Sequence, residues 1–213
     1  MTGTLSALVD RATSLLDRPG RALLGVTGAP GAGKSTLTET LLSHLSAAMG
    51  ADAVGHLPMD GFHLADVQLD RLGRRDRKGA PDTFDADGFV AALRRLHDEP
   101  DRTLFVPGFD RDLEQPIAAA IAIPPTARIV VTEGNYLLLP GGGWGRARPP
   151  MTEVWYVDVD DDARRERLVR RHEQFGKSPD AARAWVDQVD EPNARLISST
   201  RDAADLVVQL DQL

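Results

Sequence analysis

Short apolar runs recur along the chain and predict buried β-strands. Each run is bounded by polar, glycine or proline residues, and each is too short to form a core helix. The runs hold little polar–apolar alternation, which is typical of strands covered on both faces in a parallel sheet. They occupy residues 21–27, 53–59, 103–106, 127–132, 153–158 and 206–210.

Between these runs, apolar residues at spacings of three and four predict helices. The predicted helices span residues 5–17, 35–49, 87–99, 162–174 and 179–189. The charged residues 66–84 predict an exposed excursion, and the Gly/Pro-rich residues 140–150 predict a loop. Strands that alternate with helices favour a three-layer α/β/α fold around a mostly parallel, five-stranded sheet.

Composition narrows the class of protein. A chain of 213 residues has the size of one compact domain, so we expect a single domain over residues 1–213. The net charge of −7 argues against general nucleic-acid binding, and without cysteine the chain has no disulfides or thiolate metal sites. We find no secretory signal and no apolar stretch near ~18 residues, so we expect a cytoplasmic protein without a membrane span. The sequence does not determine the oligomeric state, and a homodimer is compatible with it.

The stretch GAPGAGKS at residues 28–35 fits the phosphate-binding loop G-x-x-x-x-G-K-[ST]. A predicted strand precedes it and a predicted helix follows it, which is the context that the motif requires. In such a loop the backbone N–H groups surround the phosphates, the lysine neutralises β- and γ-oxygens, and the hydroxyl binds Mg²⁺. The predicted nucleotide contacts are Gly28, Ala29, Pro30, Gly31, Ala32, Gly33, Lys34, Ser35 and Thr36.

Two acidic residues follow predicted strands at the edge where ligands bind in sheets of this kind. Glu133 ends an apolar strand, which favours a Mg²⁺ partner or a water-organising role over a carboxylate that merely meets solvent. Asp60 follows the strand at 53–59. Its carboxylate is suited to act as a general base, but an aspartate before Gly61 is also a common turn residue, and spacing leaves both interpretations open.

The predicted helix at 162–174 carries three arginines on one face, Arg164, Arg167 and Arg171. One interpretation is a lid over about 161–180 whose guanidinium groups close over the transferring phosphate. The other is a solvated basic face balanced by the acidic residues around it. The phosphate-binding loop favours the lid.

These motifs together resemble the phosphoribulokinase, uridine kinase and pantothenate kinase family of P-loop kinases. The resemblance runs in order over nearly the whole chain, and its D-G-F-H form is most similar to the nucleoside/nucleotide kinase-like branch, which includes fructose-transport-system kinases. The residues that carry it, besides the loop, are 58–64, 78–85, 106–111, 132–137, 157–160, 189–193 and 204–207.

The resemblance implies roles for individual residues. It implies that Asp60 is the catalytic base, that Glu133 helps to hold Mg²⁺, and that the lid arginines contact phosphates or acceptor. We accordingly expect catalytic roles for Asp60, Lys34, Arg167 and Arg171, and place Arg164 and Asn193 at the nucleotide. The expected substrate-binding residues are His63, Phe109, Asp110, Arg111, Asn135 and Tyr136.

The chain also departs from uridine kinases. Gly79 and Glu114 stand where those enzymes place an aspartate for the ribose and a histidine for the base, and Phe109 replaces a tyrosine. A pyrimidine nucleoside is therefore not the favoured substrate. The sequence predicts an ATP- and Mg²⁺-dependent kinase that phosphorylates a hydroxyl of a small metabolite such as a sugar, a nucleoside or a pantothenate-like acid. The alternatives are an ATP-binding regulatory protein and an ATPase without a small-molecule acceptor.

Overall fold

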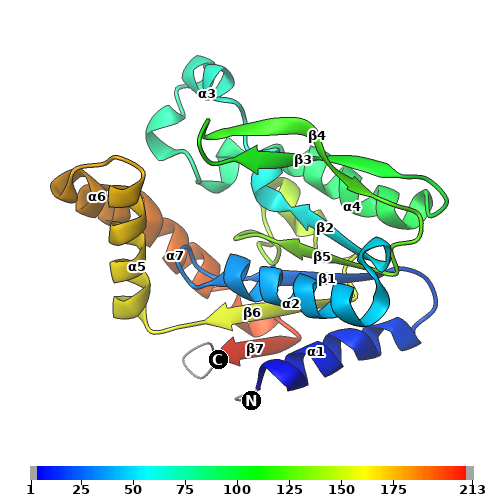
Figure 1. Ribbon diagram of the computed structural model, residues 1–213. Helices are drawn as coiled ribbons and strands as arrows, with labels where there is room; N and C mark the ends of the chain where they lie inside the picture. The colour runs from blue at the N-terminus through cyan, green and yellow to red at the C-terminus, as the bar shows by residue number, and fades with distance from the viewer. Residues whose placement is uncertain (1–3, 210–213) are drawn as a thin grey trace.

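A parallel β-sheet forms the centre of the computed structural model, which describes residues 4–209 (Figure 1). Its strand order is β2–β5–β1–β6–β7, and every neighbouring pair is parallel. The predicted five-stranded parallel sheet is thus confirmed. Its strands are β1 (Ala22–Thr27), β2 (Val54–Pro58), β5 (Ile129–Glu133), β6 (Glu153–Asp158) and β7 (Leu206–Gln209). The last residue of the predicted strand 206–210 lies outside the described residues.

Helices cover both faces of this sheet. α1 and α2 pack on one face, while α4 and α7 pack on the other, as two separate apolar clusters show. The helices are α1 (Leu5–Ser14), α2 (Lys34–Met49), α3 (Asp66–Leu72), α4 (Ala86–Asp98), α5 (Asp161–Gln174), α6 (Pro179–Trp185) and α7 (Glu191–Ser198). In the described part of the chain, no helix has both the length and the apolar character needed to cross a membrane.

The central strand explains why its sequence lacks alternation. In β1, Leu23 belongs to the cluster under α4, whereas Leu24 and Val26 belong to the cluster under α1 and α2. All six residues of β1 are buried. Because both faces of the strand meet a helical layer, every position is apolar or small, and the residues beyond its carboxyl end must turn sharply to leave the sheet.

A hairpin that the apolar pattern did not predict stands beside the main sheet. β3 (Leu104–Asp110) continues past Pro107 to the end of the expected motif, and it pairs antiparallel with β4 (Gln115–Ile123). The pairing register shifts between Val106 and Gly108, which accommodates the missing N–H of the proline. β4 was missed because its Ala-rich middle is exposed and gives no strand signal.

The carboxyl-terminal helical region is longer than predicted. The helix expected to end at residue 189 continues from α6 through a π-helical segment (Val186–Asp190) into α7. Pro192 lies in the first turn of α7, where a missing N–H costs little. The segment 66–84 is exposed only in part: it contains α3, which projects from the body of the protein (Figure 1), but it buries Leu69, Thr83 and Phe84.

Candidate active site

The loop between β1 and α2 has the conformation of an anion-binding site. Gly31 and Gly33 adopt φ of +79° and +93°, values that side chains rarely tolerate. A Cβ on Gly31 would also lie 2.9 Å from the Arg164 carbonyl oxygen. Glycine is therefore required for this turn, and it lets the loop end at the N-terminus of α2, where unpaired N–H groups carry partial positive charge.

Lys34 opens α2 and is held at the mouth of the loop. Its ammonium group donates a hydrogen bond of 2.9 Å to the Ala29 carbonyl. Burial lowers the pKa of Lys34 to about 8, although the carboxylates of Glu133 and Asp60 oppose this shift. The three charged groups thus lie close enough to affect one another, as the predicted positions at the sheet edge required.

Sheet register brings the two predicted acids to the same edge. Pro58 at the end of β2 pairs with Glu133 at the end of β5, and Glu133 pairs with Val26 of β1. Asp60 follows β2 in the 3₁₀ turn Met59–Phe62. Asp60 is therefore a turn residue whose carboxylate also interacts with Lys34 of the phosphate-binding loop, and its role as a base stays a prediction.

Glu133 lies against the hydroxyl of the loop. The Ser35 side chain lies near enough to the Glu133 carboxylate to lower its pKa, yet burial outweighs this effect and raises the pKa of Glu133. His56 Nε2 lies 3.9 Å from Glu133 Oε1, and burial lowers the pKa of His56 to about 4, so its ring is neutral. Hydroxyl and carboxylate oxygens are the hard ligands that Mg²⁺ prefers, so this pair fits that ion.

The protein supplies few ligands for a metal ion at this site. Within residues 4–209, no group of three or more His, Cys, Asp or Glu side chains is arranged to hold a metal ion. A magnesium ion at Ser35 and Glu133 would complete its coordination with nucleotide oxygens and water, which is its usual behaviour at phosphate sites.

Asp60 also meets the side chains expected at the acceptor. Its Oδ2 accepts a hydrogen bond of 3.0 Å from Arg111 Nη2, and its backbone carbonyl lies 2.9 Å from His63 Nδ1. Burial alone would raise the pKa of Asp60, but His63, Arg111, Lys34 and Arg171 outweigh it and hold this pKa below its usual value. Asp60 is therefore ionised at neutral pH.

Phe109 lies at the centre of a cluster with His63, Arg111 and Lys78. Its ring lies 4.9 Å from the His63 ring, centroid to centroid. The Arg111 guanidinium and the Lys78 ammonium each lie 5.6 Å from the Phe109 centroid. Lys78 was not among the predicted site residues. The only signal was its place in the stretch 78–85, which the resemblance included without assigning a role.

Three of the predicted substrate-binding residues also make contacts within the protein. Asp110 Oδ1 accepts two backbone N–H groups at 2.9 Å and so caps the hairpin turn. The Asn135 carbonyl accepts the Thr27 hydroxyl at 3.1 Å. Tyr136 is fully buried, packs against Trp144, and donates its hydroxyl to the Gly79 carbonyl. Tyr136 is thus a core residue, and its predicted contact with the substrate stays a prediction.

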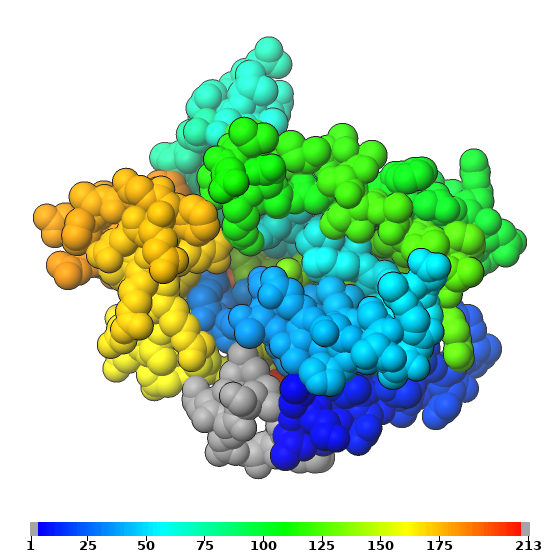
Figure 2. All heavy atoms as spheres, in the orientation of Figure 1, coloured from blue at the N-terminus to red at the C-terminus, as the bar shows by residue number. Residues whose placement is uncertain are grey.

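The predicted arginine helix is α5, whose first turn is capped by Asp160. Its three arginines differ in surroundings. Arg167 is exposed. Arg171 has part of its side chain at the surface, but burial of its guanidinium, followed by the charge of the neighbouring Arg111, lowers its pKa. In Figure 2 the α5–α6 segment (yellow to orange) stands beside the tip of the β3–β4 hairpin (green), and the surface is hollowed between them and α2 (blue).

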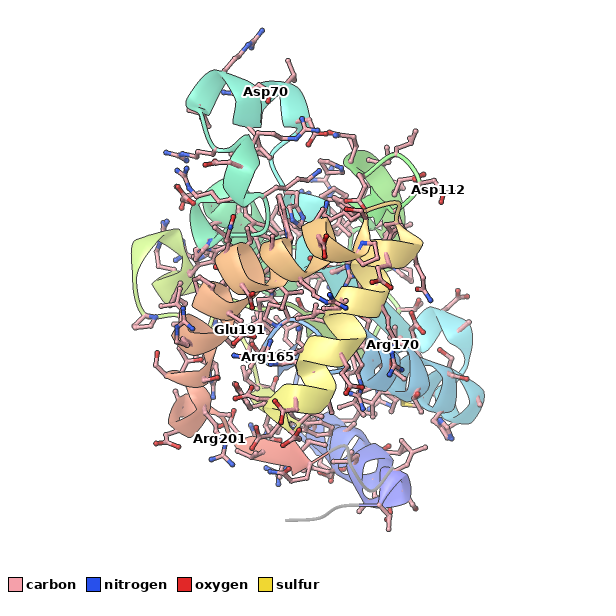
Figure 3. All side chains as sticks on the ribbon, turned by 90° about the vertical axis from the view of Figure 1, so that its left-hand side faces the viewer. Asp70, Asp112, Arg165, Arg170, Glu191 and Arg201 are labelled. Atoms are coloured by element: carbon pink, nitrogen blue, oxygen red, sulfur yellow. The ribbon has the colours of Figure 1, made fainter. Side chains whose placement is uncertain are left out.

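Arg164 is buried and joins α5 to two other elements. It pairs with Glu191 of α7 and with Asp161, and it donates to the Pro30 carbonyl of the phosphate-binding loop at 3.4 Å. Glu191 also pairs with Arg165 at 2.6 Å, an arrangement visible in Figure 3. Arg164 thus links the phosphate-binding loop to α5 and α7. Asn193, expected near the adenine, is buried on α7 two positions after Glu191.

Sequence comparisons find relatives of similar length. The "Putative uridine kinase C227.14" of Schizosaccharomyces pombe is 34% identical over 95% of this chain and 88% of its own. The Escherichia coli "Uncharacterized protein YggC" is 33% identical over 90% of this chain and 79% of its own. A model of the methylmalonyl Co-A mutase-associated GTPase MeaB family matches residues 6–60, which contain the phosphate-binding loop but less than half of the chain.

Structural comparisons also find proteins described as kinases. The crystal structure of a "putative fructose transport system kinase" from Silicibacter sp. TM1040 superposes with a TM-score of 0.87 at 38% identity, over 96% of this chain and 98% of that one. YFH7 from Saccharomyces cerevisiae, a P-loop-containing kinase by its description, gives a TM-score of 0.80 at 20% identity over 98% and 99%, and so shares the fold. The chain belongs to the phosphoribulokinase/uridine kinase-like family of P-loop kinases.

Proposed function

We propose that the protein transfers the γ-phosphoryl group of ATP to a hydroxyl of a small metabolite. The observation that carries this proposal is that three features lie together at one edge of the sheet: the glycine loop with Lys34, the Ser35–Glu133 pair, and Asp60. An acid near the phosphates but outside the metal pair is what an acceptor hydroxyl needs as a proton acceptor.

Each residue has a distinct part in the proposed reaction. The loop amides and Lys34 bind the triphosphate and neutralise charge on its β- and γ-oxygens. Ser35 and Glu133 are the residues that would hold Mg²⁺, which when bound would neutralise further phosphate charge. Asp60 takes the proton of the acceptor hydroxyl as its oxygen bonds to the γ-phosphorus and the bond to ADP breaks.

The helical segment over α5 and α6 is the proposed lid of a single domain. Arg167 and Arg171 would contribute positive charge to the transferring phosphoryl group, and closure would exclude water that otherwise competes with the acceptor. Arg164 does not share this role in the proposal, because its partners are Glu191, Asp161 and the loop backbone.

The test is a coupled assay of ADP release with ATP, Mg²⁺ and a panel of hydroxyl compounds. We expect release to depend on an acceptor. Asp60→Asn should reduce turnover by about 10²–10⁴-fold while ATP binding is nearly unchanged. The matched control is Asp70→Asn, since Asp70 is an exposed acid on α3.

Two results would contradict the proposal. ADP release at the same rate with and without every acceptor would favour an ATPase, and ATP binding without any release would favour an ATP-binding regulator. Wild-type turnover in Asp60→Asn would remove Asp60 from the mechanism while leaving phosphoryl transfer in place.

A further inference from the structure

The proposed base is not free in this structure. Asp60 Oδ2 is paired with Arg111 at 3.0 Å, and both side chains are partly exposed, at 36% and 41%. A carboxylate held by a guanidinium is a weaker proton acceptor, because proton uptake would break the ion pair. An exposed pair of this kind exchanges partners easily, since solvent screens much of its attraction. Something that binds Arg111 would therefore change the basicity of Asp60.

Cations from three separate elements gather near Asp60: Arg111 and Lys78 lie against the Phe109 ring, and Arg171 is close enough to Arg111 and Asp60 to be affected by their charges. Arg111 lies in the hairpin turn, Lys78 in the segment after α3, and Arg171 on α5. Each of them has a carboxylate neighbour: Arg111 pairs with Asp60, Lys78 donates to Asp66 Oδ1 at 2.8 Å, and Arg171 is influenced by Asp60. Further charges that act on this cluster come from Glu114, Asp190, His63, Lys34 and Glu133.

Arg111 is the cation best placed to bind an incoming anion. Its only carboxylate partner in the described part of the chain is Asp60, whereas Lys78 is fixed by Asp66 and by the Glu114 carbonyl. The guanidinium carries five N–H donors in a planar fork, and one Nη2 contact to Asp60 leaves others for a second oxyanion. The Phe109 ring supports it through a cation–π contact.

We propose that the acceptor carries a carboxylate or phosphate group that takes Arg111 away from Asp60, so that acceptor binding itself releases the base. This inference rests on the proposed function. The anion binds the guanidinium, Asp60 regains its proton affinity, and the hydroxyl of the same acceptor then gives its proton to Asp60. A neutral polyol lacks the charge to compete for Arg111 and leaves the base paired.

Such a device couples recognition to chemistry. With the acceptor site empty, water that reaches the γ-phosphate meets a carboxylate whose proton affinity is lowered by Arg111. Hydrolysis of ATP is therefore slow until an anion arrives. Arginine rather than lysine suits this role, because its planar fork matches the two oxygens of a carboxylate or phosphate.

The experiment compares acids with their neutral counterparts at saturating ATP and Mg²⁺. The probes are gluconate with glucitol and ribose 5-phosphate with ribose, so that carboxylate and phosphate are tested separately. We expect kcat/KM for at least one acid to exceed that of its neutral counterpart by about tenfold to a hundredfold. Arg111→Met should abolish this preference, while Arg102→Met, at an exposed arginine just before the hairpin, should keep it.

The pH profile separates a positioning role from a merely structural one. Arg111 lowers the pKa of Asp60, so the acidic limb of kcat/KM should move to higher pH in Arg111→Met. Arg111→Lys should retain charge but recover only part of the acid preference. Binding of the ATP analogue should be unchanged in both variants.

The outcomes distinguish this inference from the proposed function. Equal or better turnover of the neutral compounds, or an Arg111→Met variant that keeps the acid preference, would overturn the inference and leave the kinase in place. ADP release that is independent of all four compounds would count against phosphoryl transfer to an acceptor, and the inference would fall with it.

Discussion

ATP binding should weaken in mildly alkaline solution because of Lys34. This ammonium group sits at the start of α2 and burial lowers its pKa to about 8, against roughly 10.4 for an ordinary lysine. In the free protein the charged form then makes up roughly three-quarters of the molecules at pH 7.5, half at pH 8 and a tenth at pH 9. Only this form attracts the triphosphate strongly.

The apparent Kd for a non-hydrolysable ATP analogue should therefore rise about eightfold from pH 7.5 to pH 9. Isothermal titration calorimetry in buffers with different ionisation enthalpies measures both this change and the proton balance. At pH 8 binding should take up about half a proton, because the bound phosphates raise the pKa of Lys34 again.

Lys34→Arg is the matched control, since a guanidinium stays charged throughout this range. Whatever its affinity, that variant should bind with no dependence on pH between 7.5 and 9. A wild-type Kd that is constant up to pH 9.5, with no proton uptake at pH 8, would refute the argument that burial has depressed the pKa of Lys34.

Three further predictions concern stability, each measured by urea denaturation. Glu191→Gln leaves the buried Arg164 with Asp161 as its remaining carboxylate partner and should cost about 3 kcal/mol, and a loss below about 0.5 kcal/mol would show that the pair is dispensable. Gly61→Ala adds a Cβ that overlaps the Pro107 carbonyl and should lower the free energy of unfolding by about 1–3 kcal/mol. An unchanged urea midpoint would contradict this prediction. Phe105→Ser, at a ring that is 63% exposed, should change stability by less than about 0.5 kcal/mol, and a loss of more than about 1 kcal/mol would contradict this exposure.

Local signals predicted the sheet edge. The apolar runs placed Glu133 at the end of β5 and Asp60 just after β2, and parallel pairing alone then brought them together. The glycine loop was equally local, because its spacing specifies both turn and chemistry. The strand ends and the glycine loop each depend on residues that are close together in the sequence, so the pattern of residue types was sufficient to predict them.

Long-range partners could not be predicted in this way. Arg164 and Glu191 lie 27 residues apart, and nothing in the arginine spacing distinguishes a buried brace from a lid residue. The burial of Tyr136 likewise depends on Trp144 and on the Gly79 carbonyl. The role of Asp110 was visible in principle, since aspartate at the start of a turn commonly accepts N–H groups two and three residues later.

We expect the contacts of the buried Arg164 to limit which parts of the protein can move during turnover. Its guanidinium fastens the base of α5 to the phosphate-binding loop and to α7, so we expect α5 to bend beyond this point rather than swing as a whole. Motion confined to the outer half carries Arg167 and Arg171 but leaves the nucleotide cradle undisturbed. Acceptor and phosphorylated product could then come and go at the outer mouth while the adenylate portion stays in place, which favours an ordered sequence with nucleotide first in and last out.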